Sequence, residues 1–236
     1  MEYLRIQNLS KSYALSNNFF SGRQNKRPVL YDINLSIQKG EILALVGESG
    51  SGKTTLGRCL LNLISRDSGN IFLEGKNLDS LPEKYYRQRL QLIFQNTGWS
   101  LNPKQKVKSI LGEALNASAG YSKQKIETEL FRLIEEVGLS SDLLNRRPVQ
   151  LSGGQRQRVV IARALAVKPG FIVADEPTGN LDTVLQHHIL NLLLKLRREL
   201  HLTLMLITHD IQMAASMADR LGVLWQGRLV EIGPVQ

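Results

Sequence analysis

Residues 42–54 read ILALVGESGSGKT, an apolar run that passes directly into a glycine-rich turn. The apolar part, residues 42–46, is typical of a short strand buried in a sheet. The second part, residues 47–54, matches the pattern G-x-x-x-x-G-K-[ST], in which glycines let the backbone wrap closely around an anion. The stretch therefore predicts a phosphate-binding loop at the end of a buried strand.

A helix is expected to begin near Lys53, which adds the positive end of the helix dipole to the N–H groups of the loop. Lys53 is expected to reach the β- and γ-phosphates of a nucleotide, and the hydroxyl of Thr54 is expected to bind Mg²⁺. The alternative reading is a flexible surface loop rich in glycine and serine.

The composition narrows the class of protein. The chain has 236 residues, 42% of them hydrophobic, which suits one packed domain and excludes a disordered chain. No apolar run approaches the roughly 20 residues that cross a bilayer, and a single cysteine, Cys59, forms no internal disulfide and is expected in the core. The net charge of +9 suits either an ordinary solvated basic surface or an anionic membrane surface nearby, whereas no aromatic-rich basic motif points to nucleic acid.

The first part of the chain has the alternating pattern of half-buried strands. Residues 3–6, 29–37 and 70–75 show this pattern, so an antiparallel N-terminal sheet is expected. Between the first two strands lies a polar insertion, residues 15–28, whose composition predicts a surface loop.

The second part of the chain has helical periodicity and then alternates between helix and strand. Residues 96–150 are expected to form an inserted helical lobe within one domain that spans residues 1–236. Beyond it, a strand at 171–174, a helix at 184–200 and a strand at 202–207 predict βαβ units on a parallel sheet. A final hairpin is expected to turn at Gln226-Gly227.

Two carboxylates stand at the end of the strand predicted at 171–174. Asp175 falls where open α/β sheets bind ligands, so it is the expected Mg²⁺ anchor. Glu176 follows at once and is placed to polarise a water that attacks the γ-phosphate.

Residues 151–155 read LSGGQ and open a further helix. Ser152 is expected to cap that helix, and the two glycines after it leave backbone N–H groups bare, which makes a second anion site. One γ-phosphate is not easily held by two helix N-termini so far apart in one chain and still released in each cycle. The two sites are therefore expected to come from different subunits.

These motifs, in this order, resemble the nucleotide-binding subunit of ATP-binding-cassette (ABC) transporters over almost the whole chain. The resemblance implies an α/β P-loop NTPase fold with a RecA-like parallel-sheet core, an N-terminal antiparallel β-subdomain and an inserted α-helical subdomain. It also implies an ATPase in which two subunits meet head to tail, so that the LSGGQ motif of each closes over the ATP in the P-loop of the other.

The resemblance assigns roles to four further residues. Tyr13 matches the aromatic residue that stacks on adenine, and Gln95 matches the glutamine that senses Mg²⁺ and moves with the permease. Asp182 matches the loop that reaches across the dimer, although Asn180 departs from the residue the family often has there. His209 matches the switch histidine that contacts the γ-phosphate.

The expected site has three groups of residues. The catalytic residues are Glu176, His209 and Gln95. The nucleotide-binding residues are Tyr13, Gly47, Glu48, Ser49, Gly50, Ser51, Gly52, Lys53, Thr54, Thr55, Ser152, Gly153, Gly154, Gln155 and Asp182. The Mg²⁺ ligands, together with the phosphates of ATP, are Thr54, Gln95 and Asp175.

A subfamily is indicated by FQN at 94–96 followed by SLNP at 100–103, which resembles importers of oligopeptides, dipeptides and nickel. Those ATPases usually continue into a C-terminal extension, and this chain stops at Gln236. The alternative is the ATPase of a lipoprotein or macrolide exporter, because EPTGNLD at 176–182 recurs there. Cassettes of translation and DNA repair are disfavoured, since the chain has neither a second cassette nor a coiled coil.

The resemblance also implies partners and a location. We expect a second homologous ATPase, with a heterodimer favoured, two transmembrane permeases and, indirectly, a solute-binding protein. The chain would then lie peripherally on the cytoplasmic face of the membrane, with residues 95–103 in contact with a permease.

Overall fold

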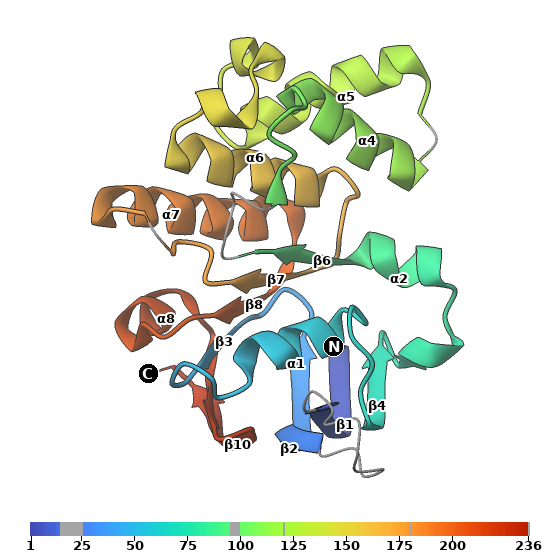
Figure 1. The fold of residues 1–236 in the computed structure, drawn as a ribbon, viewed down its shortest axis with the longest axis vertical. Helices are drawn as coiled ribbons and strands as arrows, with labels where there is room; N and C mark the ends of the chain where they lie inside the picture. The colour runs from blue at the N-terminus through green and yellow to red at the C-terminus, as the bar shows by residue number, and fades with distance from the viewer. Residues whose placement is uncertain (15–25, 95–99, 120, 180, 236) are drawn as a thin grey trace, which may run out of the picture. The chain divides into compact units, whose positions relative to one another are not determined.

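The computed structural model describes residues 1–14, 26–94, 100–119, 121–179 and 181–235. The chain divides into two compact units. The first consists of Met1–Tyr86 and Thr203–Gln236, and the second of Arg87–Leu202. Both units combine strands with helices, so the fold belongs to the predicted α/β class (Figure 1).

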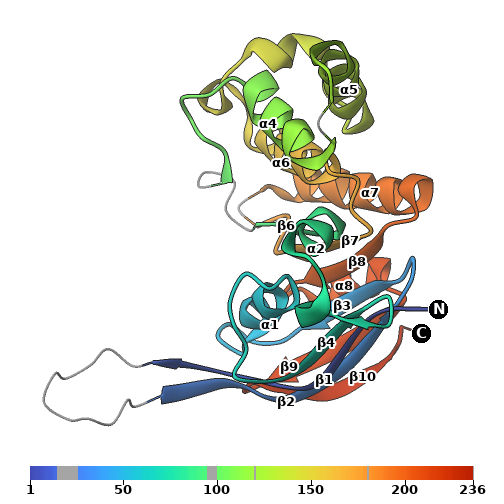
Figure 2. The same ribbon diagram turned by 90° about the vertical axis from the view of Figure 1, so that its right-hand side faces the viewer.

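The first unit contains an antiparallel sheet built from the N-terminal strands. Its order is β2-β1-β4-β5, where β1 is Glu2–Ala14, β2 is Lys26–Gln38, β4 is Ser68–Leu73 and β5 is Lys76–Asn77. Figure 2 shows β1 and β2 as long neighbouring strands. The structure confirms the antiparallel N-terminal sheet.

The polar insertion is shorter than the sequence predicted. Lys26, Arg27 and Pro28 belong to β2, where they pair with Ala14, Tyr13 and Ser12 of β1. Proline is tolerated here because β2 is the edge strand of this sheet, where a missing N–H costs no ladder hydrogen bond. The prediction of a loop up to residue 28 was therefore wrong at its end, and residues 15–25 lie outside the described residues.

A second group of strands in the first unit carries the glycine-rich loop. Its order is β10-β9-β3-β8, with β3 parallel to both β8 and β9, and with β9 and β10 antiparallel. These strands are β3 (Ile42–Val46), β8 (Thr203–Ile207), β9 (Arg220–Trp225) and β10 (Arg228–Pro234). Every residue of β3 and β8 is buried, as in parallel strands covered on both faces. Gln226 and Gly227, both at positive φ, form the predicted hairpin turn.

Helices complete the first unit. They are α1 (Lys53–Leu60), η1 (Leu78–Ser80), α2 (Glu83–Arg89) and α8 (Ile211–Met217). The last residues of α2, from Arg87, belong to the second unit. Helix α1 buries Leu56, Cys59 and Leu60, which confirms Cys59 as a core residue. Burial raises the pKa of the Cys59 thiol to about 11, so the side chain stays a neutral packing group.

The second unit combines a parallel strand pair with a group of helices. Strand β6 (Leu90–Ile93) runs parallel to β7 (Phe171–Asp175). The helices are α4 (Val107–Ala119), α5 (Lys123–Glu136), η2 (Ser141–Asn145), η3 (Pro148–Gln150), α6 (Gly153–Leu165) and α7 (Thr183–Leu200). Helices α4, α5 and α6 pack on one another (Figure 1). Residues 96–150 belong to this unit. That they form a separate inserted lobe stays a prediction.

Among the described residues, no helix combines the length and the apolar composition that crossing a bilayer requires.

Candidate functional site: the glycine-rich loop and the sequence motifs

The loop that follows β3 has a backbone that only glycine permits at two positions. Gly47 and Gly52 have φ values of 153° and 108°. A Cβ on Gly47 would lie 2.1 Å from the carbonyl oxygen of Leu224, and one on Gly52 would lie 2.8 Å from a methyl group of Leu30. The loop therefore lies tightly against β9 and β2, and both glycines are needed for this close approach.

Lys53 is the first residue of α1, directly after the left-handed Gly52. Its side chain is buried, and Nζ donates hydrogen bonds to the carbonyl oxygens of Gly47 (2.7 Å) and Glu48 (2.8 Å). The ammonium group is thus held over the loop by the loop's own backbone. The helix N-terminus adds further positive potential at the same place.

Ser51 contributes a buried hydroxyl group to the loop. Its hydroxyl oxygen is buried and has no hydrogen-bond partner among the described residues. A buried hydroxyl without a partner normally costs free energy, so such groups mark places where a ligand or water belongs. The loop backbone, the Lys53 ammonium and this hydroxyl together fit the phosphates of a nucleotide.

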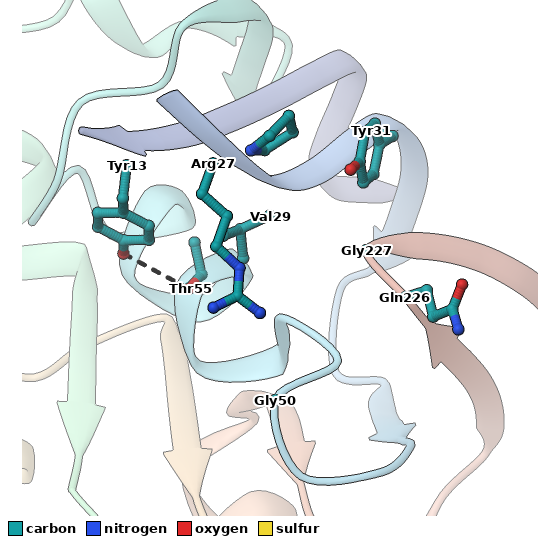
Figure 3. Close-up of a pocket in the computed structure, with 9 residues that line it drawn as sticks. Tyr13, Arg27, Val29, Tyr31, Gly50, Thr55, Gln226 and Gly227 are labelled. Carbon is teal, nitrogen blue, oxygen red and sulfur yellow. Dashed lines mark hydrogen bonds between the residues drawn. The ribbon is translucent and has the colours of Figure 1, made fainter. Parts of the chain in front are cut away.

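A cavity of about 810 Å³ opens beside the loop (Figure 3). It is lined by Tyr13, Gly50 and Thr55, by Arg27, Pro28, Val29 and Tyr31 of β2, and by the β9–β10 turn. Its volume is in the range of small-molecule sites. Tyr13 is 39% exposed, which rules out its alternative reading as a core residue. Its hydroxyl lies 3.5 Å from the hydroxyl of Thr55, so the aromatic ring and the end of the glycine-rich loop share one cavity.

His209 lies just beyond β8 in the first unit and is exposed. The residues on either side hold its backbone in place. The N–H of Asp210 donates to the Thr208 hydroxyl at 3.0 Å, and the Asp210 carboxylate accepts from the N–H of Met213 at 2.9 Å, which caps α8. The histidine is therefore presented at a strand end by a buried threonine and a helix cap.

In the second unit, Asp175 ends β7 and is buried. Glu176 follows with a φ of +45°, and its carbonyl oxygen accepts a hydrogen bond from the N–H of Gly179 at 3.0 Å. A left-handed backbone costs a non-glycine residue roughly 1–2 kcal/mol. Such strain gathers at functional positions, where the surrounding structure holds a side chain in a required direction.

The LSGGQ motif begins α6 as predicted. The Ser152 hydroxyl accepts from the N–H of Gln155 at 3.2 Å, and the Gln155 side chain accepts from the N–H of Ser152 at 3.0 Å. This reciprocal capping box confirms the N-cap. The glycines have a second role that the sequence did not reveal. A Cβ on Gly153 or Gly154 would lie 3.2 Å from the methyl groups of Leu181 or Leu185, so both allow the start of α7 to pack closely.

Asp182 has a local role in the second unit. Its carboxylate accepts a hydrogen bond from the N–H of Leu185 at 2.9 Å and so caps α7. The contact across a dimer that the resemblance implies for Asp182 stays a prediction. Gln95 and Asn180 lie outside the described residues.

The structure adds one residue that sequence reasoning missed. Arg27 lines the same cavity as Tyr13, because the two residues face each other across the β1–β2 ladder. It belongs to no motif, and the composition of its surroundings had placed it in a loop. Only the strand register gives it a position at the site.

Comparison with known proteins identifies the family. The model of the ABC transporter family matches residues 30–179. The chain belongs to the ABC transporter family. Its ATP-binding relatives include the oligopeptide transport ATP-binding protein OppF of Streptococcus mutans serotype c, 43% identical over 91% of this chain and 71% of the relative. The dipeptide transport ATP-binding protein DppF of Lactococcus lactis subsp. cremoris is also 43% identical, over the same shares.

Solved structures agree with this ABC assignment. The ATP-binding cassette MJ0796, described as dimeric and bound to ADP and Pi in a post-hydrolysis state, has a TM-score of 0.84 and 28% identity over 99% of both chains. The protein cbiO1 of Clostridium perfringens, part of the cbiONQ transporter complex, has a TM-score of 0.84 and 26% identity over 99% of this chain and 89% of cbiO1. This ABC protein is thus an ATP-hydrolysing transporter ATPase that binds ATP.

Proposed function

We propose that this chain is the ATPase subunit of an importer of oligopeptides or dipeptides. The observation that carries the proposal is its likeness to relatives named for oligopeptide and dipeptide transport over nearly the whole chain. The sequence features at residues 94–103 had already favoured an importer of this kind. Nickel, or a metal bound to a chelator, belongs to the same predicted subfamily and is tested below as a competing cargo.

The phosphates of ATP are assigned to the loop at residues 47–55, with Lys53 on the β- and γ-phosphates. Tyr13 supplies a face for adenine. Thr54, Asp175 and Gln95 are the Mg²⁺ ligands. One carboxylate and a hydroxyl, completed by phosphate oxygens, suit Mg²⁺, which usually takes few protein ligands.

Each catalytic group has one task in the proposed reaction. The Glu176 carboxylate orients the attacking water and accepts its proton, and His209 donates a hydrogen bond toward the γ-phosphate. Lys53 stabilises the charge that develops on the transferred phosphoryl group. Mg²⁺, when bound with ATP, supplies further neutralisation of phosphate charge. The ATP held by the opposite subunit is contacted by the LSGGQ residues Ser152, Gly153, Gly154 and Gln155, and by the loop that carries Asp182.

The proposed assembly pairs this chain with a second homologous ATPase beneath two permeases, at the cytoplasmic face of the membrane. A heterodimer is favoured. The net charge of +9 suits this position, because each basic residue near an anionic membrane contributes about 1 kcal/mol. The permease contact is assigned to residues 95–103, of which 95–99 lie outside the described residues.

The cargo is tested by transport. Deleting the gene is expected to abolish uptake of a labelled tripeptide or dipeptide, and the parent gene, but not a Glu176→Gln copy, is expected to restore it. Uptake of radioactive nickel is measured in the same strains. If the deletion abolishes nickel uptake and leaves peptide uptake intact, the cargo is the metal and not a peptide. If it abolishes neither uptake but impairs efflux, the result favours the alternative of a lipoprotein or macrolide exporter.

Shared sites predict complementation between two inactive variants when this chain pairs with itself. Ser152→Arg blocks the motif that closes over the other subunit, and Lys53→Ala disables the subunit's own loop. In a symmetric dimer, each site combines the loop of one subunit with the LSGGQ motif of the other. A mixed dimer therefore has one site with both parts intact and one site with both parts altered, so it is expected to regain about one working site. ATPase activity of the mixture is measured against the separate proteins.

The control for that experiment removes a helix cap elsewhere. Ser122 caps α5 by accepting from the N–H of Lys125 at 3.3 Å, just as Ser152 caps α6. Ser122→Arg therefore makes the same substitution with the same loss of a cap, about 1 kcal/mol, away from the proposed site. It should keep its activity. A mixture whose subunits have demonstrably exchanged, but whose rate equals the sum of its parts, contradicts shared sites.

A further inference from the structure

Arg27 is an unassigned cation at the edge of the proposed nucleotide site. It lies on β2 directly opposite Tyr13 on β1. Side chains of such opposed residues start about 5 Å apart and point to the same face of the sheet. Both therefore enter the same cavity of about 810 Å³, together with Thr55 and Gly50 of the phosphate loop (Figure 3).

The direction of the Arg27 side chain brings its charge toward the phosphate loop. In Figure 3 the guanidinium group extends from β2 past Val29 and Thr55 toward the segment that carries Gly50. Tyr13 lies on the other side of Thr55 in the same view. In this view Thr55 thus lies between the aromatic ring and the cation, and the guanidinium faces the loop on the side where the sugar end of a phosphate chain would lie if the base rests on Tyr13.

The charge of Arg27 is not neutralised within the described part of the chain. The residue is exposed, and among the described residues no carboxylate forms an ion pair with it. Other arginines of the same unit do have such partners: Arg66 pairs with Asp79, and Arg220 pairs with Glu41 at 3.0 Å. None of the described residues that line the cavity is acidic. A cavity with a free guanidinium, an aromatic face and no carboxylate favours a ligand that is anionic at one end.

We propose that Arg27 binds the α-phosphate of the bound nucleotide from the β2 side, opposite the phosphate loop. This inference rests on the proposed nucleotide site. The loop N–H groups cradle the α- and β-phosphates and Lys53 reaches the β- and γ-phosphates, so the α-phosphate is the one without a cation of its own. A cation beside Tyr13 can approach its other side. A guanidinium suits it because its planar fork donates two parallel hydrogen bonds to phosphate oxygens.

The proposal predicts a loss of affinity that is shared by ADP and ATP, since both carry the α-phosphate. Arg27→Gln is expected to weaken binding of each by about 3- to 10-fold, as for an exposed charge-assisted contact. Arg27→Lys keeps the charge and should recover most of the affinity. The difference between the parent and Arg27→Gln should shrink as salt is raised from low to high ionic strength, because added ions screen an exposed charge.

The matched control is Lys26→Gln. Lys26 directly precedes Arg27 on β2 but, unlike Arg27, is not among the residues that line the cavity. It carries the same charge and is also exposed. Lys26→Gln therefore changes the net charge of the protein by the same amount, and it should bind ADP and ATP like the parent. Dissociation constants are measured for the whole chain by equilibrium dialysis with radiolabelled ADP and ATP.

Any one of three results overturns the proposal. The first is a dissociation constant of Arg27→Gln within about twofold of the parent value. The others are equal losses of affinity in Arg27→Gln and Lys26→Gln, or an affinity in Arg27→Lys that does not recover. Lys53→Ala, measured in parallel, separates the two levels of inference. If Lys53→Ala loses affinity and Arg27→Gln does not, only the role of Arg27 is wrong. If Lys53→Ala also binds like the parent, the proposed nucleotide site itself is wrong.

Discussion

Replacing Glu176 with Gln is expected to leave ATP bound while turnover falls by about 10²- to 10⁴-fold, the usual cost of removing a general base. The amide keeps the size of the carboxylate but cannot accept the proton of the attacking water. Binding should survive because Glu176 belongs to a different part of the chain from the loop that is assigned to the phosphates.

The backbone at Glu176 makes Gln the informative substitution. The residue has a φ of +45°, a conformation that costs Glu and Gln similarly, so the exchange adds no new backbone strain. A smaller residue would change the packing around a half-buried side chain as well as its chemistry. The effect of Glu176→Gln on rate therefore reports on the proton-accepting group alone.

The measurement is phosphate release under saturating ATP, together with binding of a fluorescent ATP analogue. Glu135→Gln is the control, because it removes an exposed carboxylate from α5 in the same unit. It should hydrolyse ATP at the parent rate. Activity of Glu176→Gln within about threefold of the parent would refute its assignment as the base.

Replacing Lys53 with Ala should weaken nucleotide binding itself. A hydrogen bond to a charged group is worth about 1.5–3 kcal/mol, so a loss of roughly 10- to 100-fold in affinity is expected. The ammonium that leaves is the one held over the loop by the carbonyl oxygens of Gly47 and Glu48. Its removal takes away the positive charge that lies closest to the proposed phosphates.

A titration with fluorescent ATP measures this loss. Lys53→Met serves as a second variant, because Lys53 is buried and Met fills its volume without leaving a cavity. Lys39→Ala removes an exposed lysine of the same unit and is expected to bind normally. Unchanged affinity in both Lys53 variants would contradict the phosphate cradle.

Features encoded by neighbouring residues were predictable from the sequence. The apolar run at 42–46 and the glycines after it predict a strand, a loop and the beginning of a helix near Lys53. Strand β3 has these bounds, and α1 begins at Lys53. Ser152 lies three residues before Gln155, the spacing of a capping box, and the cap is present. The hairpin at Gln226-Gly227 follows from Gly227, which adopts positive φ without steric cost. Backbone preference and periodicity act over a few residues, so they can be read along the chain.

Features that depend on distant residues were decided by the tertiary structure alone. Gly47 must lack a side chain because the carbonyl oxygen of Leu224, far along the chain, lies where its Cβ would be. Gly153 makes room for Leu181 in the same way. Arg27 entered the site only because the register of β1 and β2 sets it opposite Tyr13. A shift of one residue would turn its side chain to the other face, and no local pattern in residues 15–28 records that register.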